Sequence, residues 1–292
     1  MEPVKMEVML PVGIDSASNV SERGRTSPVE GATRATTAVK FDAVVLPLVT
    51  FLIVIGVWAL ISHTVAVHLP DPIRTFTQSW DLIRSPFFDN GPNDMGLGWQ
   101  LLYSLGRVAA GFGLAALVGI PAGFLIGASA KFRMALDPLI QILRPVSPLA
   151  WLPIGLATFQ AANPAATFVI FITALWPILL NTAFGVTQIN PDYLSVARIL
   201  RLSWWQTLRR ILFPATLPYI FTGLKIALGV AWLVIVAVEM LTGGVGIGFF
   251  VWDEWNNLSL EHIILAIIMI GGVGFILDRL ISAVARRYEY AA

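Results

Sequence analysis

The 292-residue sequence predicts an all-α integral membrane protein with about six transmembrane helices. Two features of the composition lead to this fold class. Hydrophobic residues make up 57% of the chain, and charged residues make up 13%, against about 25% in soluble proteins. The mean hydropathy is +0.76. Apolar runs near the roughly 20 residues that cross a bilayer then recur along residues 41–292, which we expect to form one membrane domain.

Residues 1–40 precede the first apolar run and differ from it in composition. They are rich in Ser, Thr, Val and Glu and contain five basic and five acidic residues. They also lack the apolar core of a cleavable signal near the start. A segment of this kind buries too little apolar surface to fold by itself, so we expect a flexible tail.

Six apolar runs have the length of a transmembrane helix, namely 43–63, 102–127, 138–159, 165–183, 216–241 and 262–284. The third differs from the others because it contains Pro138, Pro145, Pro148 and Pro153. Proline interrupts helical hydrogen bonding, and broken backbone at membrane depth is tolerated only against protein or a water-filled cavity. We expect this span to be kinked or broken and to face protein or a cavity.

The second span carries Gly119, Gly123 and Gly127 at four-residue spacing. Glycines in this pattern let a neighbouring helix approach closely. We expect them to pack against a helix of the same subunit, and an interface between subunits is the alternative.

The distribution of lysine and arginine predicts the orientation of the chain. Sixteen of the 19 basic residues fall in the N-terminal segment, in the loops after spans two and four, and at the C-terminus. The opposite side holds only Arg74, Arg84 and Arg107. Because basic residues remain on the cytoplasmic side, both termini and the segment 190–215 are expected there.

Two segments are expected outside. Residues 64–101 contain Ile73, Phe76, Trp80 and Ile83 at helical spacing, which indicates an amphipathic helix that rests on the membrane or binds a partner. Residues 242–262 are rich in glycine and aromatic residues, contain no lysine or arginine, and are expected to form a loop with tight turns.

The cytoplasmic segment 190–215 has the signals of two short helices. Asn190 and Pro191 are typical of a helix start, and Ser203 with Gln206 has the spacing of a capping box. The segment therefore predicts a helical elbow that bends between Arg201 and Ser203 and ends at Pro214.

The surface of this elbow allows two uses. Trp204, Leu208 and Ile211 fall on one stripe, so the elbow could rest on lipid with its arginines at the head groups. It could instead insert the adjacent Trp204 and Trp205 into a groove of a soluble partner, since Trp and Arg are enriched at binding hot spots. The tandem tryptophans at the turn favour the second use.

The elbow resembles the cytoplasmic EAA signature of ATP-binding-cassette (ABC) importer permeases. The signature spacing matches Ala197, Arg201, Ile211 and Pro214, although Arg201 stands where the signature has glycine. The stretches SLGRVAAGFGLAALVGIPAGFLIG, DPLIQILRPVSPLAWLPIGLATF and GGVGIGFF are similar to the nitrate, sulfonate, taurine and bicarbonate branch of this family. Within that branch the similarity is greatest to cyanobacterial nitrate permeases, with bicarbonate permeases as the alternative.

This resemblance implies a type I importer fold in a bacterial, cyanobacterial, plasma membrane. It also implies a homodimer with two cytoplasmic ATPase subunits, an external substrate-binding protein and a small inorganic anion as substrate. The residues implied to couple the elbow to the ATPase are Ser195, Ala197, Arg198, Arg201, Leu202, Ser203, Trp204, Trp205, Arg209 and Pro214.

The sequence lacks the glycine-rich phosphate loop of ATPases, so we expect ATP and magnesium on partner subunits and no cofactor on this chain. The few polar or aromatic candidates for the translocation path are Arg107, Trp151, Trp176, Asn181, Lys225 and Trp232. Arg107 and Lys225 lie near span ends, where a side chain can also reach the membrane surface. Glu239 would repel an anion and is assigned to interior pairing.

Other functions have less support in the sequence. His63, His68 and His262 lack the spacing of metal ligands, so no metal site is expected. The net charge of +1, with dispersed cations, argues against a nucleic-acid partner. A secondary transporter working alone would predict inverted repeats and buried coupling charges, and a membrane enzyme would need a catalytic constellation; neither pattern is evident.

Overall fold

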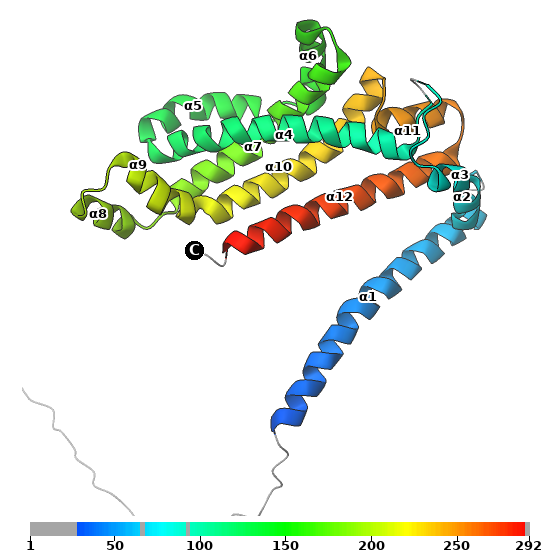
Figure 1. Cartoon of the computed structure of the whole chain (residues 1–292), viewed down its shortest axis with the longest axis horizontal. Coiled ribbons are helices and arrows are strands. Elements are labelled where there is room, and N and C mark those ends of the chain that lie inside the picture. The colour runs from blue at the N-terminus through cyan, green and yellow to red at the C-terminus, as the bar shows by residue number, and fades with distance from the viewer. Residues whose placement is uncertain (1–27, 65–67, 92–93, 290–292) are drawn as a thin grey trace, which may run out of the picture. The chain divides into compact units, whose positions relative to one another are not determined.

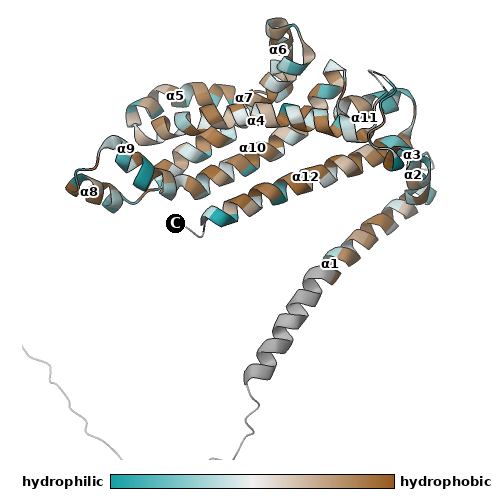
Figure 2. Cartoon of the chain, in the orientation of Figure 1, coloured by the Kyte–Doolittle hydropathy of each residue, from teal (hydrophilic) through white to brown (hydrophobic). Residues whose placement is uncertain are grey.

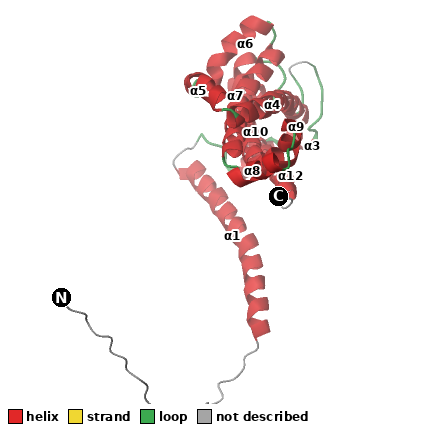
Figure 3. Ribbon diagram, turned by 90° about the vertical axis from the view of Figure 1, so that its left-hand side faces the viewer, coloured by secondary structure: helices red, strands yellow, loops and turns green. Residues whose placement is uncertain are grey.

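The computed structural model describes residues 28–64, 68–91 and 94–289, and every element in them is a helix (Figures 1 and 3). The chain divides into two compact units, Met1–Val57 and Trp58–Ala292. Helix α1 (Pro28–Thr64) contains the boundary. Residues 28–40 of the expected tail are part of α1, while residues 1–27 lie outside the described part. Extending an existing helix adds a hydrogen bond per residue without a new nucleation cost.

Three long helices form the core of the second unit: α4 (Leu97–Ala128), α7 (Ala162–Thr187) and α10 (Phe213–Thr242). The repeated glycines of α4 bring it directly onto α7. A Cβ atom on Gly123 would lie 2.6 Å from Thr182 Cβ, and Gly119 and Gly127 face the same helix. The prediction of packing within one subunit is confirmed, because α7 already occupies the glycine face.

The proline-rich span is broken, as predicted. It consists of α5 (Ala130–Leu143), a 3₁₀ turn η1 (Pro148–Trp151) and α6 (Leu152–Phe159). The two arms bend by 96° around residues 144–147. The predicted boundary at residue 138 is wrong, because α5 begins at Ala130 and includes Pro138 in its interior.

Of the two segments predicted to lie outside, the first forms its expected helix in two parts and the second contains more helix than expected. The amphipathic segment forms two short helices, α2 (Pro72–Gln78) and α3 (Trp80–Arg84), and its apolar residues Ile73 and Phe76 are exposed. The predicted loop 242–262 contains helix α11 (Ile247–Asn256). Its glycines do supply the expected turn, because Gly243 and Gly244 have positive φ angles of 72° and 90° just before the helix.

The last helix, α12 (Leu260–Glu289), packs against α10 and α11. Among the described residues, five helices are long and apolar enough to span a membrane, or six with the bent pair α5 and α6. Hydrophilic colour is concentrated towards opposite ends of the second unit (Figure 2). One end carries α8 (Pro191–Ile199), α9 (Trp204–Thr207) and the end of α12, and the other carries α2 and α3 (Figure 1).

Candidate functional site

The first candidate region is the elbow between α7 and α10. Asn190 caps α8 by accepting a hydrogen bond from Asp192 N at 2.9 Å. The helix ends with Arg201 at a φ of +48°, in the left-handed region that glycine usually occupies. Arg201 N donates to Arg198 O at 3.1 Å and Leu202 N donates to Ala197 O at 3.0 Å. This is the Schellman arrangement, and it shows that the arginine makes the turn of the missing glycine.

The capping box predicted after the bend is present. Gln206 N donates to Ser203 Oγ, and Ser203 N donates to Gln206 Oε1 at 2.9 Å. The expected stop at Pro214 is wrong, because the chain continues from α9 through a π-helical turn, η2 (Leu208–Leu212), into α10. Proline is tolerated in the first turn of a helix, and here Pro214 follows a change of helical hydrogen-bonding pattern.

Two tryptophans form an exposed apolar surface at the start of α9. Trp204 is 65% exposed and Trp205 is 63% exposed, and their ring centroids lie 6.3 Å apart. The structure thus places both indoles outside the core of the unit. A helical start fixed by a capping box holds them in one place, which suits a contact with another surface.

The remaining residues predicted for coupling have different positions. Arg198 bonds within α8, to Ser195 Oγ at 3.2 Å, and Ala197 is buried. A hollow of about 310 Å³ between the two short helices is lined by Leu194, Ala197, Arg198, Leu202 and Thr207. Arg209 is exposed on η2.

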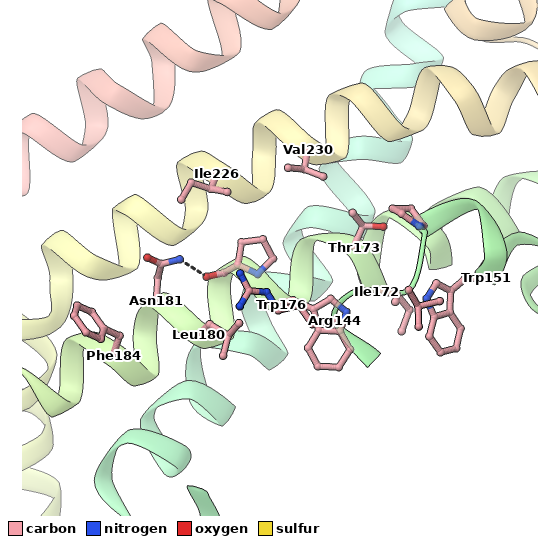
Figure 4. Close-up of a pocket in the computed structure, with 13 residues that line it drawn as sticks. Arg144, Trp151, Ile172, Thr173, Trp176, Leu180, Asn181, Phe184, Ile226 and Val230 are labelled. Atoms are coloured by element: carbon pink, nitrogen blue, oxygen red, sulfur yellow. Dashed lines mark hydrogen bonds between the residues drawn. The ribbon is translucent and has the colours of Figure 1, made fainter. Parts of the chain in front are cut away.

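The second candidate region is a cavity of about 560 Å³ between the broken span, α7 and α10 (Figure 4). Of the residues predicted for the path, Trp151, Trp176 and Asn181 line it. Asn181 Nδ2 donates to Pro177 O at 2.8 Å, and its carbonyl oxygen has no hydrogen-bond donor among the described residues. Arg144 also lines the cavity, from the break between α5 and η1.

Sequence reasoning missed Arg144 as a cavity residue and counted it only as a cytoplasmic charge. The available signal was its place beside Pro145 in the proline-broken span, because irregular backbone at membrane depth lines protein or water. Its position relative to α7 depends on the 96° bend, which the sequence does not specify.

Arg107 lies away from this cavity and does not reach for the membrane surface. Its side chain is only 11% exposed. The guanidinium binds Glu239 Oε1 at 2.5 Å, Val245 O at 2.6 Å and Asn163 Oδ1 at 2.9 Å. Ser104 Oγ donates to the other carboxylate oxygen of Glu239 at 2.8 Å. The network joins α4, α7, α10 and the turn before α11.

The last two residues predicted for the path connect α10 with α12. Lys225 Nζ lies 3.2 Å from Asp278 Oδ1, and both side chains are half-exposed. Trp232 is buried and its Nε1 donates to Ile270 O at 3.0 Å. Neither residue lines the cavity described above.

The described residues contain no cluster of three or more His, Asp or Glu side chains that could hold a metal ion. His262 lies 2.9 Å from Glu254, and His63 lies 3.9 Å from Asp71. His68 is exposed.

Comparison with known proteins identifies the family. Residues 119–290 match the model of the "binding-protein-dependent transport system inner membrane component". A nitrate import permease protein of Synechocystis is 52% identical over 82% of this chain and 87% of its own length. A bicarbonate transport system permease protein of Synechococcus elongatus is 50% identical over 85% of this chain and 90% of its own length.

A solved structure supports the same fold. The bacterial ABC transporter involved in the import of the polysaccharide alginate matches with a TM-score of 0.53 and 15% identity. The match covers 87% of this chain and 99% of that chain. The type I importer fold expected from the sequence is confirmed.

Proposed function

The chain belongs to the inner membrane components of binding-protein-dependent transport systems, and we propose that it is the permease of an ATP-driven importer for nitrate and nitrite. The observation that carries the choice of substrate is the identity of 52% and 53% to two nitrate import permease proteins, each over 82% of this chain. As a multi-pass permease subunit of an ABC importer, it is not itself an enzyme.

Bicarbonate is the second candidate substrate. Bicarbonate permease relatives are 50% to 52% identical to this chain, which is nearly the same level. Nitrate and bicarbonate are both planar ions with one negative charge, so a membrane path suited to one is chemically close to a path for the other.

We further propose a homodimer that binds two cytoplasmic ATPase subunits and an external substrate-binding protein. ATP and magnesium are then held by the ATPase subunits, with no cofactor on this chain. The elbow supports the contact with the ATPase through its exposed tryptophans. The clustering of basic residues supports an orientation with this elbow and both termini in the cytoplasm.

Reconstitution of the permease with its ATPase and binding protein tests the function. In proteoliposomes, nitrate should stimulate both ATP turnover and anion uptake, and bicarbonate should stimulate neither. A reversed preference would establish the bicarbonate alternative. Anion uptake by the permease without the ATPase would contradict an ATP-driven importer.

Replacement of Trp204 and Trp205 by alanine tests the proposed coupling contact. We expect the double variant to insert normally but to lose at least about tenfold in uptake, because each buried aromatic anchor contributes about 2 kcal/mol or more at an interface. Uptake, membrane insertion and ATPase binding are measured together. The matched control replaces both residues by phenylalanine, which keeps apolar rings at the contact and should retain most uptake; normal uptake in the alanine variant would refute the contact.

A further inference from the structure

We infer that the cavity between the broken span, α7 and α10 binds a planar oxyanion with one negative charge, and that Arg144 is its cationic group. The inference rests on the proposed function, because it locates the transported anion within the permease. It differs from the path expected from the sequence, which relied on Arg107 and Lys225 as the cations.

The charges around the cavity favour an anion. Arg144 is the one charged residue among the described residues that line it. Within the described part of the chain, its guanidinium has no hydrogen bond or ion pair with another side chain. Asp137 lines an adjoining hollow that Arg144 also borders, but no ion pair joins the two residues. The cation therefore remains available to a ligand.

The contrast with Arg107 sharpens this assignment. All three nitrogen atoms of the Arg107 guanidinium donate to protein oxygens, and one of those oxygens belongs to a carboxylate. An anion would have to displace Glu239 to bind there. A cation that lines a cavity and lacks a structural partner is the better candidate for a transport site.

The other polar groups of the cavity complete a donor set. Trp151 and Trp176 line it, and the indole N–H of neither has an acceptor among the described residues. In Figure 4, the Arg144 and Trp176 side chains both lie on the side of the cavity that faces the broken span. The fork of a guanidinium fits two oxygens of a planar oxyanion, and an indole N–H can donate to a further oxygen.

The size of the cavity and the character of its walls fit a path. Its volume of about 560 Å³ exceeds that of a small inorganic ion, so the ion would keep part of its hydration shell. Apolar residues such as Ile172, Leu180 and Val230 form the rest of the wall. One cation with few donors holds an anion weakly, and weak holding allows release.

Asn181 provides a difference between the two candidate anions. One N–H of its amide donates to Pro177 O, and the described residues offer no partner to its other N–H or to its carbonyl oxygen. Nitrate has only acceptors, whereas bicarbonate has one O–H that can donate to this oxygen. Asn181 can therefore accept a hydrogen bond from bicarbonate that nitrate cannot donate.

The test measures uptake of nitrate and of bicarbonate by the complete transporter in proteoliposomes, with Arg144→Gln and Arg144→Lys. The glutamine variant should lower uptake of the transported anion by about 10- to 100-fold, because it removes charge-assisted hydrogen bonds, and the lysine variant should recover part of it. Lys131→Gln is the matched control, since it removes an exposed cation from the start of α5, the helix that precedes Arg144, outside the cavity.

The outcomes separate this inference from the proposed function. ATP turnover stimulated by the binding protein should persist in Arg144→Gln, which shows an assembled complex. Unchanged uptake in that variant, while the unmodified transporter moves nitrate, overturns the anion site alone. Failure of the unmodified transporter to move either anion overturns the proposed function. Loss of ATP turnover together with uptake in both Arg144 variants would make the residue structural and would also overturn the site.

Discussion

The backbone of Arg201 is the most unusual feature of the elbow. Its φ of +48° places a residue with a side chain where the family signature has glycine. The left-handed conformation costs an ordinary residue about 1–2 kcal/mol relative to its preferred region. The two hydrogen bonds that end α8 keep the turn formed despite that cost.

Arg201→Gly should therefore stabilise the elbow by about 1 kcal/mol, because glycine adopts this φ without the steric penalty. Hydrogen exchange measures the effect at the amides of residues 201 and 202, whose protection should rise about fivefold. Arg201→Ala is the control, since it removes the charge but retains a Cβ atom. Equal gains in the two variants would attribute the effect to the side chain rather than the backbone.

Arg144 in the cavity and Arg107 in the network with Glu239 show how much can be predicted from single residues of the sequence. The sequence pointed to Arg107 as a cation of the path and counted Arg144 only as a cytoplasmic charge. It did not show that Arg107 is paired, because its partner Glu239 lies 132 positions away along the chain. Which cation is neutralised by the protein depends on how α4 and α10 meet. Composition and local spacing carry no information about that contact.

At the scale of elements, local sequence signals predicted helix starts, breaks and packing faces correctly where a few neighbouring residues determine them. The capping box at Ser203 and Gln206, the break in the proline-rich span and the glycine face of α4 all follow from short-range chemistry. Local signals did not predict that the helix continues past Pro214 or that α11 forms within the expected loop. Proline in the first turn after a π-helical turn does not end a helix, and the glycines before α11 make a turn that leads into a helix packed on α10 and α12.

The ion pair between Arg107 and Glu239 connects α4 with α10. Arg107→Ala should lower the free energy of unfolding by about 3–5 kcal/mol, because it leaves the carboxylate of Glu239 buried without its cation. Unfolding in detergent provides the measurement.

Two further variants control this prediction. Lys225→Ala breaks a half-exposed pair and should cost at most about 1 kcal/mol. The double variant Arg107→Met with Glu239→Leu should cost less than the two single changes added together, because no charge remains buried. Additive losses would show that the two side chains do not act as a pair.

At the scale of the whole molecule, apolar runs predicted the spanning helices and their order. The limits of the runs differed from the helices by several residues, as for α5, since helices continue past the apolar segment. The predicted orientation in the membrane depends on the distribution of basic residues. The elbow and the end of α12 lie at one end of the second unit, which agrees with their sharing one side (Figure 1).

The absence of cysteine from the sequence makes this orientation directly testable. Ile199 in the elbow is 80% exposed, and Leu258 after α11 is 81% exposed, so Ile199→Cys and Leu258→Cys form a matched pair. In intact cells, a membrane-impermeant maleimide should label Cys at position 258 and should label position 199 only after permeabilisation. Because the two positions are equally accessible in the folded chain, a difference in labelling reports the membrane barrier, and the reverse pattern would place the elbow outside and remove it from any cytoplasmic ATPase.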